Sequence, residues 1–231
     1  MILWLRTGLF FAGWVIATLM IGLIALPALI SQRATWGVAY HWAGFTLFWL
    51  CVSCGTRSSA RGLEHLPQGA GLIASKHQSA WDTLMLWRLL KNPAFVLKRE
   101  LYWIPIFGWY LWRAGQIGID RSSGRDAVSR MLRGAKKVIA EGRCIIIFPE
   151  GTRVPPGEQK PFRTGVARVS ESLQLPVVPA ALNSGLFWPK YSLKKLPGEA
   201  VMEFLPAEPP FREPLEPWLQ HLQQIINTRS A

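Results

Sequence analysis

Residues 144–153 read Cys-Ile-Ile-Ile-Phe-Pro-Glu-Gly-Thr-Arg, an apolar run followed directly by a polar turn. The bounded apolar run predicts a buried strand, and the Gly-Thr-Arg sequence predicts a tight turn at its end. Glycine lets backbone N–H groups approach an anionic oxygen closely, and a guanidinium can bind two phosphate oxygens at once. The stretch therefore predicts a strand that ends in a phosphate-binding turn. Taken alone, it also fits an ordinary exit from strand to loop.

Short apolar runs of this kind recur along the chain and alternate with longer mixed segments. Runs of bounded length that contain branched residues predict strands at residues 71–75, 94–98, 116–120, 144–148, 177–182 and 201–205. Apolar residues at helical spacing predict helices at residues 79–90, 125–140, 164–174 and 218–227. The proline-rich stretch 206–217 predicts an extended surface connector. The alternation predicts an α/β fold with a mixed, mainly parallel sheet flanked by helices.

The first 56 residues differ in composition from the remainder. They contain no Asp or Glu and only two cations. Two uncharged runs, 7–32 and 34–56, are each long enough to cross a bilayer core as a helix. We therefore expect an N-terminal apolar two-helix membrane hairpin at 1–56, which anchors an α/β domain at 57–231.

The hairpin turn is predicted at Ser31, Gln32 and Arg33. Cations at the opposite ends of the two helices favour a cytoplasmic N-terminus and a main domain that faces the cytoplasm from the inner membrane; they are Arg6, Arg57, Arg61 and Lys76. Two other arrangements stay open. Pro27 would allow a kinked hairpin that enters one leaflet only, and residues 1–30 also resemble a signal peptide, although their apolar region is longer than such a peptide needs.

The α/β region is strongly basic. The chain carries 26 Lys and Arg residues against 14 Asp and Glu residues, and nearly all of both kinds lie beyond residue 56. Anionic partners are therefore expected. Nucleic acid would satisfy the charge, but a protein that binds nucleic acid gains nothing from a lipid anchor. We expect membrane phospholipid as a partner and no nucleic acid.

An imidazole and a carboxylate follow the predicted strand at 71–75. Residues 76–82 read Lys-His-Gln-Ser-Ala-Trp-Asp. With His77 on the loop and Asp82 in the first turn of the next helix, the carboxylate can bind one ring nitrogen and leave the other to accept a proton from an alcohol. The alternative is structural, because Ser79 and Asp82 also fit a capping box that serves only the helix end.

A second arginine follows the predicted strand at 116–120. Residues 115–121 read Gly-Gln-Ile-Gly-Ile-Asp-Arg. Arg121 and Arg153 could together bracket a phosphate, because each ends a predicted strand. An ion pair between Arg121 and Asp120 on a solvated loop is the alternative.

Residues 101–113 concentrate five Trp and Tyr side chains between cations. This composition suits the headgroup depth of a membrane. It equally suits packing in the core or the lining of an acyl-chain groove. Pro105 and Gly108 argue against one uninterrupted interfacial helix.

Several other catalytic signatures are missing from the sequence. It contains no G-x-S-x-G elbow, no Walker P-loop and no H-E-x-x-H motif. Cys51 and Cys54 form a C-x-x-C pair, but no second pair completes a zinc set. We therefore expect no metal and no bound cofactor.

Four ordered blocks resemble the 1-acyl-sn-glycerol-3-phosphate acyltransferase family of lysophospholipid acyltransferases. The blocks H-x4-D, G-x-I-x-I-D-R, F-P-E-G-T-R and a V-P-V-type strand correspond to His77–Asp82, Gly115–Arg121, Phe148–Arg153 and Val177–Leu182. The fourth block departs slightly from the pattern and reads V-V-P-A. Lys76 also stands where asparagine often precedes the histidine, and we expect it to alter contact with the acceptor or the membrane.

The resemblance implies a membrane-bound enzyme of phospholipid biosynthesis. Such an enzyme moves a fatty acyl group from acyl-CoA or acyl carrier protein to the sn-2 hydroxyl of 1-acyl-sn-glycerol-3-phosphate (lysophosphatidic acid) and forms phosphatidic acid. Catalysis is assigned to His77 and Asp82, and phosphate binding to Arg121, Glu150, Gly151, Thr152 and Arg153. Glu150 fits only by orienting an arginine or a backbone amide, because a carboxylate repels phosphate.

Two alternatives stay open. The first is the same acyl transfer to another lysophospholipid or to a lyso-aminolipid, since H-x4-D specifies the reaction better than the headgroup. The second is a membrane protein that binds anionic lipid without catalysis, which the charge and the anchor alone would support. Such a protein has no use for the paired His77 and Asp82.

Overall fold

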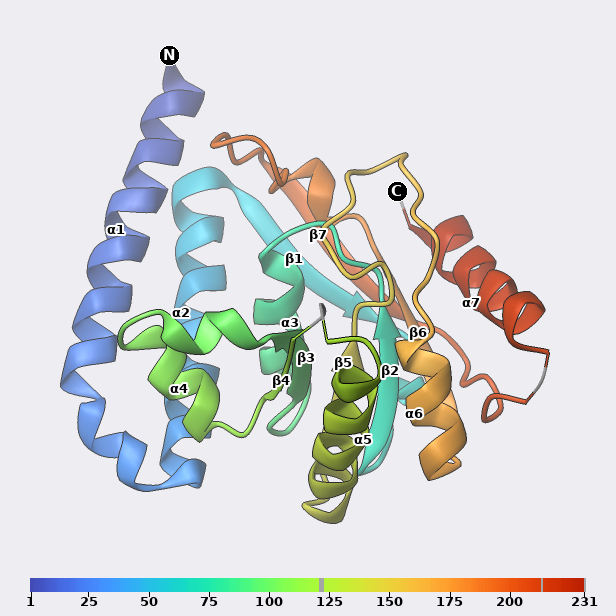
Figure 1. The fold of residues 1–231 in the computed structure, drawn as a ribbon. Coiled ribbons are helices and arrows are strands. Elements are labelled where there is room, and N and C mark those ends of the chain that lie inside the picture. Colours follow the sequence, from blue (N-terminus) through green and yellow to red (C-terminus); the bar gives the residue numbers. More distant parts are fainter. Residues whose placement is uncertain (121–122, 213, 231) are drawn as a thin grey trace.

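A seven-stranded sheet forms the centre of the protein (Figure 1). The structure is a computed structural model that describes residues 1–120, 123–212 and 214–230. Its strands are β1 (Thr56–Arg61), β2 (Gly71–Ser75), β3 (Ala94–Lys98), β4 (Ile117–Ile119), β5 (Cys144–Ile147), β6 (Val177–Leu182) and β7 (Gly198–Phe204). They lie in the order β1-β7-β6-β2-β5-β3-β4, and only β6 and β7 are antiparallel neighbours. The predicted mixed, mainly parallel sheet is confirmed.

Helices cover both faces of this sheet. They are α1 (Ile2–Ile24), α2 (Gln32–Cys54), α3 (Trp81–Leu89), α4 (Phe107–Arg113), α5 (Arg125–Ala140), α6 (Gly165–Leu173) and α7 (Leu215–Arg229). Figure 1 shows α1, α2 and α4 on one side of the sheet and α5, α6 and α7 on the other. The sheet is therefore the middle of three layers.

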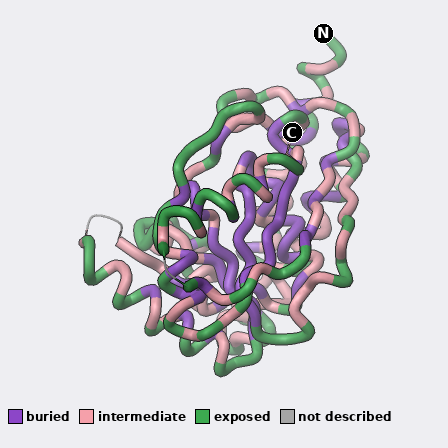
Figure 2. Tube along the Cα trace, turned by 90° about the vertical axis from the view of Figure 1, so that its right-hand side faces the viewer, coloured by how far each residue is buried: buried purple, intermediate pink, exposed green. Residues whose placement is uncertain are grey.

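The two faces of the sheet contribute to two hydrophobic cores. Ile73 and Ile146 pack with the hairpin and α3, whereas Leu72 and Ile145 pack with α5, α6 and α7. Successive side chains of a strand point to opposite faces, so a strand covered on both sides is apolar throughout. Figure 2 shows the buried residues running along the central strands. The continuous apolar runs that predicted β2 and β5 have this cause.

The N-terminal hairpin packs directly against the sheet layer. Phe10 of α1 and Leu47 and Leu50 of α2 belong to the same core as Trp81 of α3. Both helices are long and apolar enough to cross a membrane. The predicted anchor and the predicted α/β domain thus share one hydrophobic core, and α2 leads into β1 at Gly55.

The hairpin turn differs from the prediction. It is a 3-10 helix at Leu26–Ile30, and Arg33 already lies inside α2. Ser31 is the N-cap of α2, where its hydroxyl accepts a hydrogen bond from the backbone N–H of Ala34. Pro27 lies in the 3-10 turn beyond the end of α1, so it does not kink a spanning helix.

The proline-rich stretch was predicted to exclude a helix, and this is wrong at its C-terminal end. The helix α7 begins at Leu215 and includes Pro217. Proline is tolerated in the first turn of a helix, because the backbone N–H that it lacks would have no partner there. The connector is therefore shorter than predicted.

Candidate active site

The predicted site residues that the structure describes gather at one edge of the sheet. The parallel strands β2, β5 and β6 all end at this edge. His77 follows β2, the loop that begins at Phe148 follows β5, and Ser184 follows β6. Ligands commonly bind outside the carboxyl ends of the strands in open α/β sheets. The topology thus brings together groups that are far apart in the sequence.

His77 and Asp82 form a hydrogen-bonded pair. The distance from Nδ1 of His77 to Oδ2 of Asp82 is 2.8 Å. The histidine lies on the loop before α3, and Asp82 lies in the first turn of that helix. This is the geometry that the five-residue spacing predicts. Because Nδ1 is engaged by the carboxylate, Nε2 is the ring nitrogen suited to accept a proton from a substrate.

Asp82 is fully buried and is held by several donors. Its Oδ2 atom accepts the backbone N–H groups of Gln78 at 2.8 Å and Ser79 at 2.9 Å, and its Oδ1 atom accepts the hydroxyl of Ser184. The hydroxyl of Ser79 accepts the N–H of Trp81 at 2.9 Å. Ser79 and Asp82 therefore bind backbone N–H groups at the start of α3, although the N-cap of that helix is Ala80, and Asp82 holds His77 at the same time. No sequence motif indicated Ser184, which lies 102 residues from Asp82.

The loop after β5 holds His77 from another side. The ring of Phe148 stacks on the imidazole with a centroid distance of 3.9 Å and an interplanar angle of 18°. The carbonyl of His77 accepts the N–H of Val154 at 2.7 Å. Stacking, a side-chain bond and a backbone bond together limit how far the imidazole can turn.

Glu150 lies behind the site and does not line the cavity that His77 faces. It is fully buried; Oε1 accepts the Lys76 ammonium at 2.6 Å, and Oε2 accepts the backbone N–H of His77 at 3.1 Å. Burial raises the pKa of this carboxyl, while Lys76 and the His77 N–H lower it. Glu150 therefore orients a backbone amide, which is the condition under which it fits the site. Lys76 is 2% exposed, so the expected contact with acceptor or membrane is wrong.

Gly151, Thr152 and Arg153 line the cavity. Gly151 has a φ of 70°, and a Cβ atom there would lie 2.7 Å from Nε of Arg163, so the turn requires glycine. The Lys190 ammonium donates to the Arg153 carbonyl at 2.8 Å and approaches the Thr152 hydroxyl at 3.4 Å. Lys190 adds a cation that no sequence motif indicated.

Arg121, the other predicted phosphate-binding residue, lies outside the described residues. The strand before it, β4, is in place and ends at Ile119. Its neighbour β3 is parallel to it and to β5. The role of Arg121 remains a prediction.

One cavity connects the polar loops with the hairpin. Its volume is ≈ 710 Å³, which lies within the range of roughly 300–1,000 Å³ that is common for ligand sites. Four groups that can bind or move charge lie on the loops after β2, β5 and β6, namely His77, Thr152, Arg153 and Lys190, and Lys98 of β3 also lines the cavity. The remaining wall is mostly apolar and comes from α1, α2, α3, β3 and α4; it includes Leu19, Trp42, Trp87, Phe107 and Leu111. A polar headgroup and a long apolar chain would fit opposite ends of this cavity.

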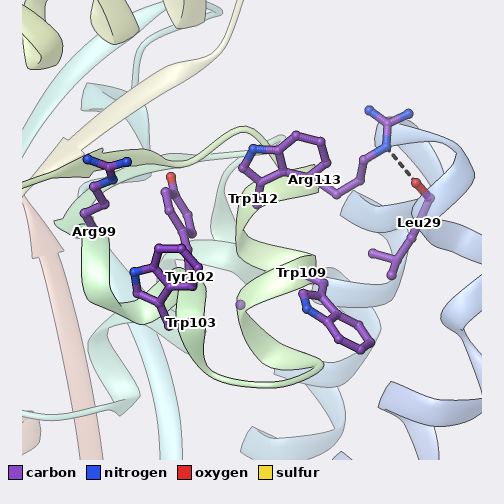
Figure 3. Close-up of a pocket in the computed structure, with 8 residues that line it drawn as sticks. Leu29, Arg99, Tyr102, Trp103, Trp109, Trp112 and Arg113 are labelled. Atoms are coloured by element: carbon purple, nitrogen blue, oxygen red, sulfur yellow. Dashed lines mark hydrogen bonds between the residues drawn. The ribbon is translucent and has the colours of Figure 1, made fainter.

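The aromatic segment at 101–113 has side chains in two settings. Tyr110 and Leu111 line the cavity, whereas Trp103, Trp109 and Trp112 are 78%, 51% and 69% exposed. The outer side forms a second, smaller hollow with Arg99 and Arg113 (Figure 3). As Pro105 and Gly108 suggested, the segment is broken, into a 3-10 turn and α4.

Hydrogen bonds attach α4 to the hairpin. Nε of Arg113 donates to the carbonyl of Leu29 at 2.7 Å, as Figure 3 shows, and the Tyr110 hydroxyl donates to the carbonyl of Gly22 at 3.0 Å. Nε1 of Trp36 donates to the carbonyl of Ala114 at 2.9 Å. The exposed tryptophans therefore lie beside the hairpin turn at a fixed position.

Metal binding is not indicated by the part of the chain that the structure describes. Within it, no three His, Cys, Asp or Glu side chains cluster closely enough to hold an ion. Cys51, Cys54 and Cys144 are free thiols, and burial raises the pKa of Cys144 to about 11. The expectation of chemistry without a metal stays a prediction.

Residues 57–183 match the family described as Acyltransferase. This segment is more than half of the chain and contains the His77–Asp82 pair and the loop after β5. The chain therefore belongs to the acyltransferase family.

Curated relatives of the chain within this acyltransferase family share one name. The chain is 38% identical over 170 residues to a 1-acyl-sn-glycerol-3-phosphate acyltransferase of Pseudomonas aeruginosa, with 74% of this chain and 66% of the relative covered. It is 33% identical to 1-acyl-sn-glycerol-3-phosphate acyltransferase alpha of Homo sapiens, with 67% and 56% covered, and 33% identical to a Cocos nucifera protein named 1-acyl-sn-glycerol-3-phosphate acyltransferase, with 80% and 59% covered. The matches thus span a little over half to two thirds of the relatives' own length.

A solved structure has the same fold. It is the crystal structure of the 1-acyl-sn-glycerophosphate (LPA) acyltransferase, PlsC, from Thermotoga maritima. The TM-score is 0.78 at 20% sequence identity, and the alignment covers 98% of this chain and 93% of that one. Because it covers nearly the whole chain, the likeness includes the hairpin as well as the sheet.

Proposed function

We propose that this protein transfers a fatty acyl group from an acyl thioester to the sn-2 hydroxyl of 1-acyl-sn-glycerol-3-phosphate and so forms phosphatidic acid. The observation that carries the proposal is the cavity, in which His77 lies beside two cations at one end of a long apolar wall. The relatives' names support the choice of acceptor.

The proposed reaction needs one proton acceptor. Nε2 of His77 takes the proton of the acceptor hydroxyl while the oxygen attacks the thioester carbonyl carbon. The new C–O bond forms, the C–S bond breaks, and the proton passes from His77 to the leaving thiolate. Asp82 fixes the tautomer through Nδ1 and stabilises the imidazolium in between. No residue needs to carry the acyl group.

The acceptor phosphate would bind at the cationic end of the cavity. Arg153 is exposed there, and no acidic side chain of the described ranges pairs with it. Lys190 lies on the segment between β6 and β7, and its ammonium donates to the Arg153 carbonyl at 2.8 Å. A phosphate held by these cations would bring the neighbouring hydroxyl to His77, which is where fixed geometry has most effect on rate. We assign the same role to Arg121 by its place in the second sequence block.

The donor would be acyl-CoA or acyl carrier protein, both of which are anionic. The chain has a formal net charge of +12, so an acidic carrier or the phosphates of CoA would be attracted to it. We propose that the donor acts as a co-substrate and that no bound cofactor takes part.

The reacting lipids have long chains, and we propose that the protein works at the cytoplasmic membrane with the sheet on the cytoplasmic side. The two apolar helices support membrane association. The exposed Trp103, Trp109 and Trp112 beside Arg99 and Arg113 suit the headgroup region, where tryptophan and arginine are favoured. A lipid chain could then enter the cavity without crossing water.

Mass spectrometry of reaction products tests the proposal. Purified protein is given several lyso-acceptors together with acyl-CoA or acyl carrier donor, and we expect phosphatidic acid from lysophosphatidic acid. If another lysophospholipid or a lyso-aminolipid is acylated in preference, the proposed acceptor is wrong and the acyl-transfer reaction stands. If no pair of donor and acceptor gives an acylated product, the proposed enzyme activity is wrong, and a protein that binds anionic lipid without catalysis is the hypothesis that remains.

A further inference from the structure

Two buried polar side chains and a half-buried one form a hydrogen-bonded group near His77 but outside the cavity lining. Lys76 precedes the histidine, Glu150 belongs to the loop after β5, and Asn227 lies near the end of α7. The Lys76 ammonium donates to Oε1 of Glu150 at 2.6 Å and to Oδ1 of Asn227 at 2.9 Å. The C-terminal helix is thereby connected to the residue beside the proposed base.

The ammonium and the carboxylate depend on each other. Lys76 is 2% exposed and Glu150 is fully buried, so neither charge is solvated by water. Burial alone favours the neutral carboxylic acid, and the Lys76 ammonium opposes this effect. A buried charge without its partner is strongly unfavourable, which makes a single replacement more damaging than the loss of both.

Glu150 connects this ion pair to the backbone of His77. Its second oxygen accepts the backbone N–H of His77 at 3.1 Å, while the N–H of Val154 donates to the His77 carbonyl at 2.7 Å. Both peptide groups of the histidine are thus bonded to the segment that follows β5. The rotation of the imidazole toward the cavity depends on this backbone position.

We propose that Lys76 and Asn227 are positioning residues for His77, and that they act through the Glu150 carboxylate. Lys76 favours the charged form of that carboxylate and holds it in place, and Asn227 fixes the ammonium from α7. The inference rests on the proposed acyl transfer, because it assigns these residues to the geometry of its base. It extends the catalytic arrangement to the last helix of the chain, beyond the segment matched to the family.

Three variants test the coupling, with kcat and the KM for lysophosphatidic acid measured separately. Lys76→Met leaves Glu150 unpaired, and we expect kcat to fall about 10²-fold, the effect of a misplacement of roughly 1 Å, with KM within about twofold. Lys76→Met with Glu150→Gln removes both charges, and kcat should recover about tenfold, as expected for coupling between contacting residues. Asn227→Leu should lower kcat about tenfold for the same reason.

Lys195 provides a matched control. It is also buried, at 1% exposure, and its ammonium donates to the carbonyl of Leu193 at 2.9 Å, away from the cavity lining. Lys195→Met removes a buried ammonium of the same kind and should lower the melting temperature. We expect kcat to stay within about twofold, because substitutions at residues that share no contacts usually have independent effects. An equal loss of kcat in this variant would show a general effect of destabilisation and would overturn the inference.

Hydrogen–deuterium exchange gives a readout that does not need turnover. We expect the amides of residues 76–82 to exchange faster in Lys76→Met and in Asn227→Leu, and to regain protection in the double variant. If wild-type protein makes no phosphatidic acid, the proposed function fails, and the exchange result still tests the coupling. Unchanged exchange in these amides overturns the inference, whether or not kcat falls. Asn227→Leu retains the ion pair between Lys76 and Glu150, so it tests the inference even if Lys76→Met does not fold.

Discussion

The two ends of the cavity are built in different ways. At the polar end, His77 is joined to the loop from Phe148 to Val154 by two hydrogen bonds, of 3.1 and 2.7 Å, between residues that are distant in sequence. At the apolar end, helices of the hairpin and α4 contribute side chains such as Leu19 and Trp42. Proton transfer depends on fixed geometry, whereas binding a lipid chain needs mainly apolar area. The polar end should therefore tolerate much less change.

The largest effect is expected at the polar end from His77→Ala. Removing a positioned base should lower kcat by about 10²–10⁴-fold, since proton transfer in the transition state is lost. Steady-state acylation of lysophosphatidic acid by folded, membrane-bound protein measures it. His221→Ala changes an exposed histidine on α7 and should leave kcat unchanged. Full turnover in His77→Ala would show that the base is another group.

A smaller effect is expected from Arg153→Ala. Loss of a charged contact to the acceptor phosphate, worth roughly 1.5–3 kcal/mol, should raise the KM for lysophosphatidic acid by about one to two orders of magnitude. The KM for the acyl donor should change little. Arg168→Ala on α6, where the guanidinium pairs with Glu171, is the matched control. Equal changes in both KM values would argue against a phosphate contact.

At the apolar end, Ala39→Phe should change selectivity without stopping the reaction. Ala39 lines the cavity from α2, and a phenyl ring there would exclude several methylene groups from it. With about 0.8 kcal/mol for each buried methylene, kcat/KM for the longest chains should fall at least tenfold relative to short chains. Val52→Phe, at an exposed position of the same helix, should leave the chain-length profile intact. The same profile in both variants would mean that chains bind elsewhere.

The smallest effect is expected outside the cavity, at the exposed tryptophans. Replacement of Trp103, Trp109 and Trp112 by serine should weaken binding to phospholipid vesicles several-fold, because interfacial aromatic area is lost while the hairpin remains. Turnover with detergent-dispersed substrates should stay within about twofold. Leu193→Ser, also on the surface, is the control. A vesicle-binding curve that coincides with wild type would remove this face from the membrane contact.

Sequence reasoning located the parts of the site that lie in compact motifs. The strands β2, β3 and β6 and the helix α5 were predicted at their observed bounds, because bounded apolar runs and regular spacing mark buried elements. The edge strand β1 was missed because its sequence, Thr-Arg-Ser-Ser-Ala-Arg, has no apolar run. The short helix α4 was missed because Pro105 and Gly108 obscure its pattern.

The contacts between motifs could not be predicted in the same way. Ser184 lies 102 residues from Asp82, and Glu150 lies 74 residues from Lys76. Only the strand order β6-β2-β5 brings these groups together. The burial of Lys76 was also unforeseen, since lysine is almost never fully buried without a partner and that partner is remote in the sequence.

Photolabelling tests most directly whether one cavity joins the proton-transfer site to a lipid chain. Lysophosphatidic acid and acyl-CoA that carry a diazirine at the end of the chain are given in turn to the purified protein, and labelled peptides are mapped by mass spectrometry. The account predicts that at least one of the two probes labels the cavity wall in α1, α2 or α4, near Leu19, Ala39 or Leu111, and that unlabelled lipid competes. Labelling by both probes only at surfaces outside this wall would contradict it.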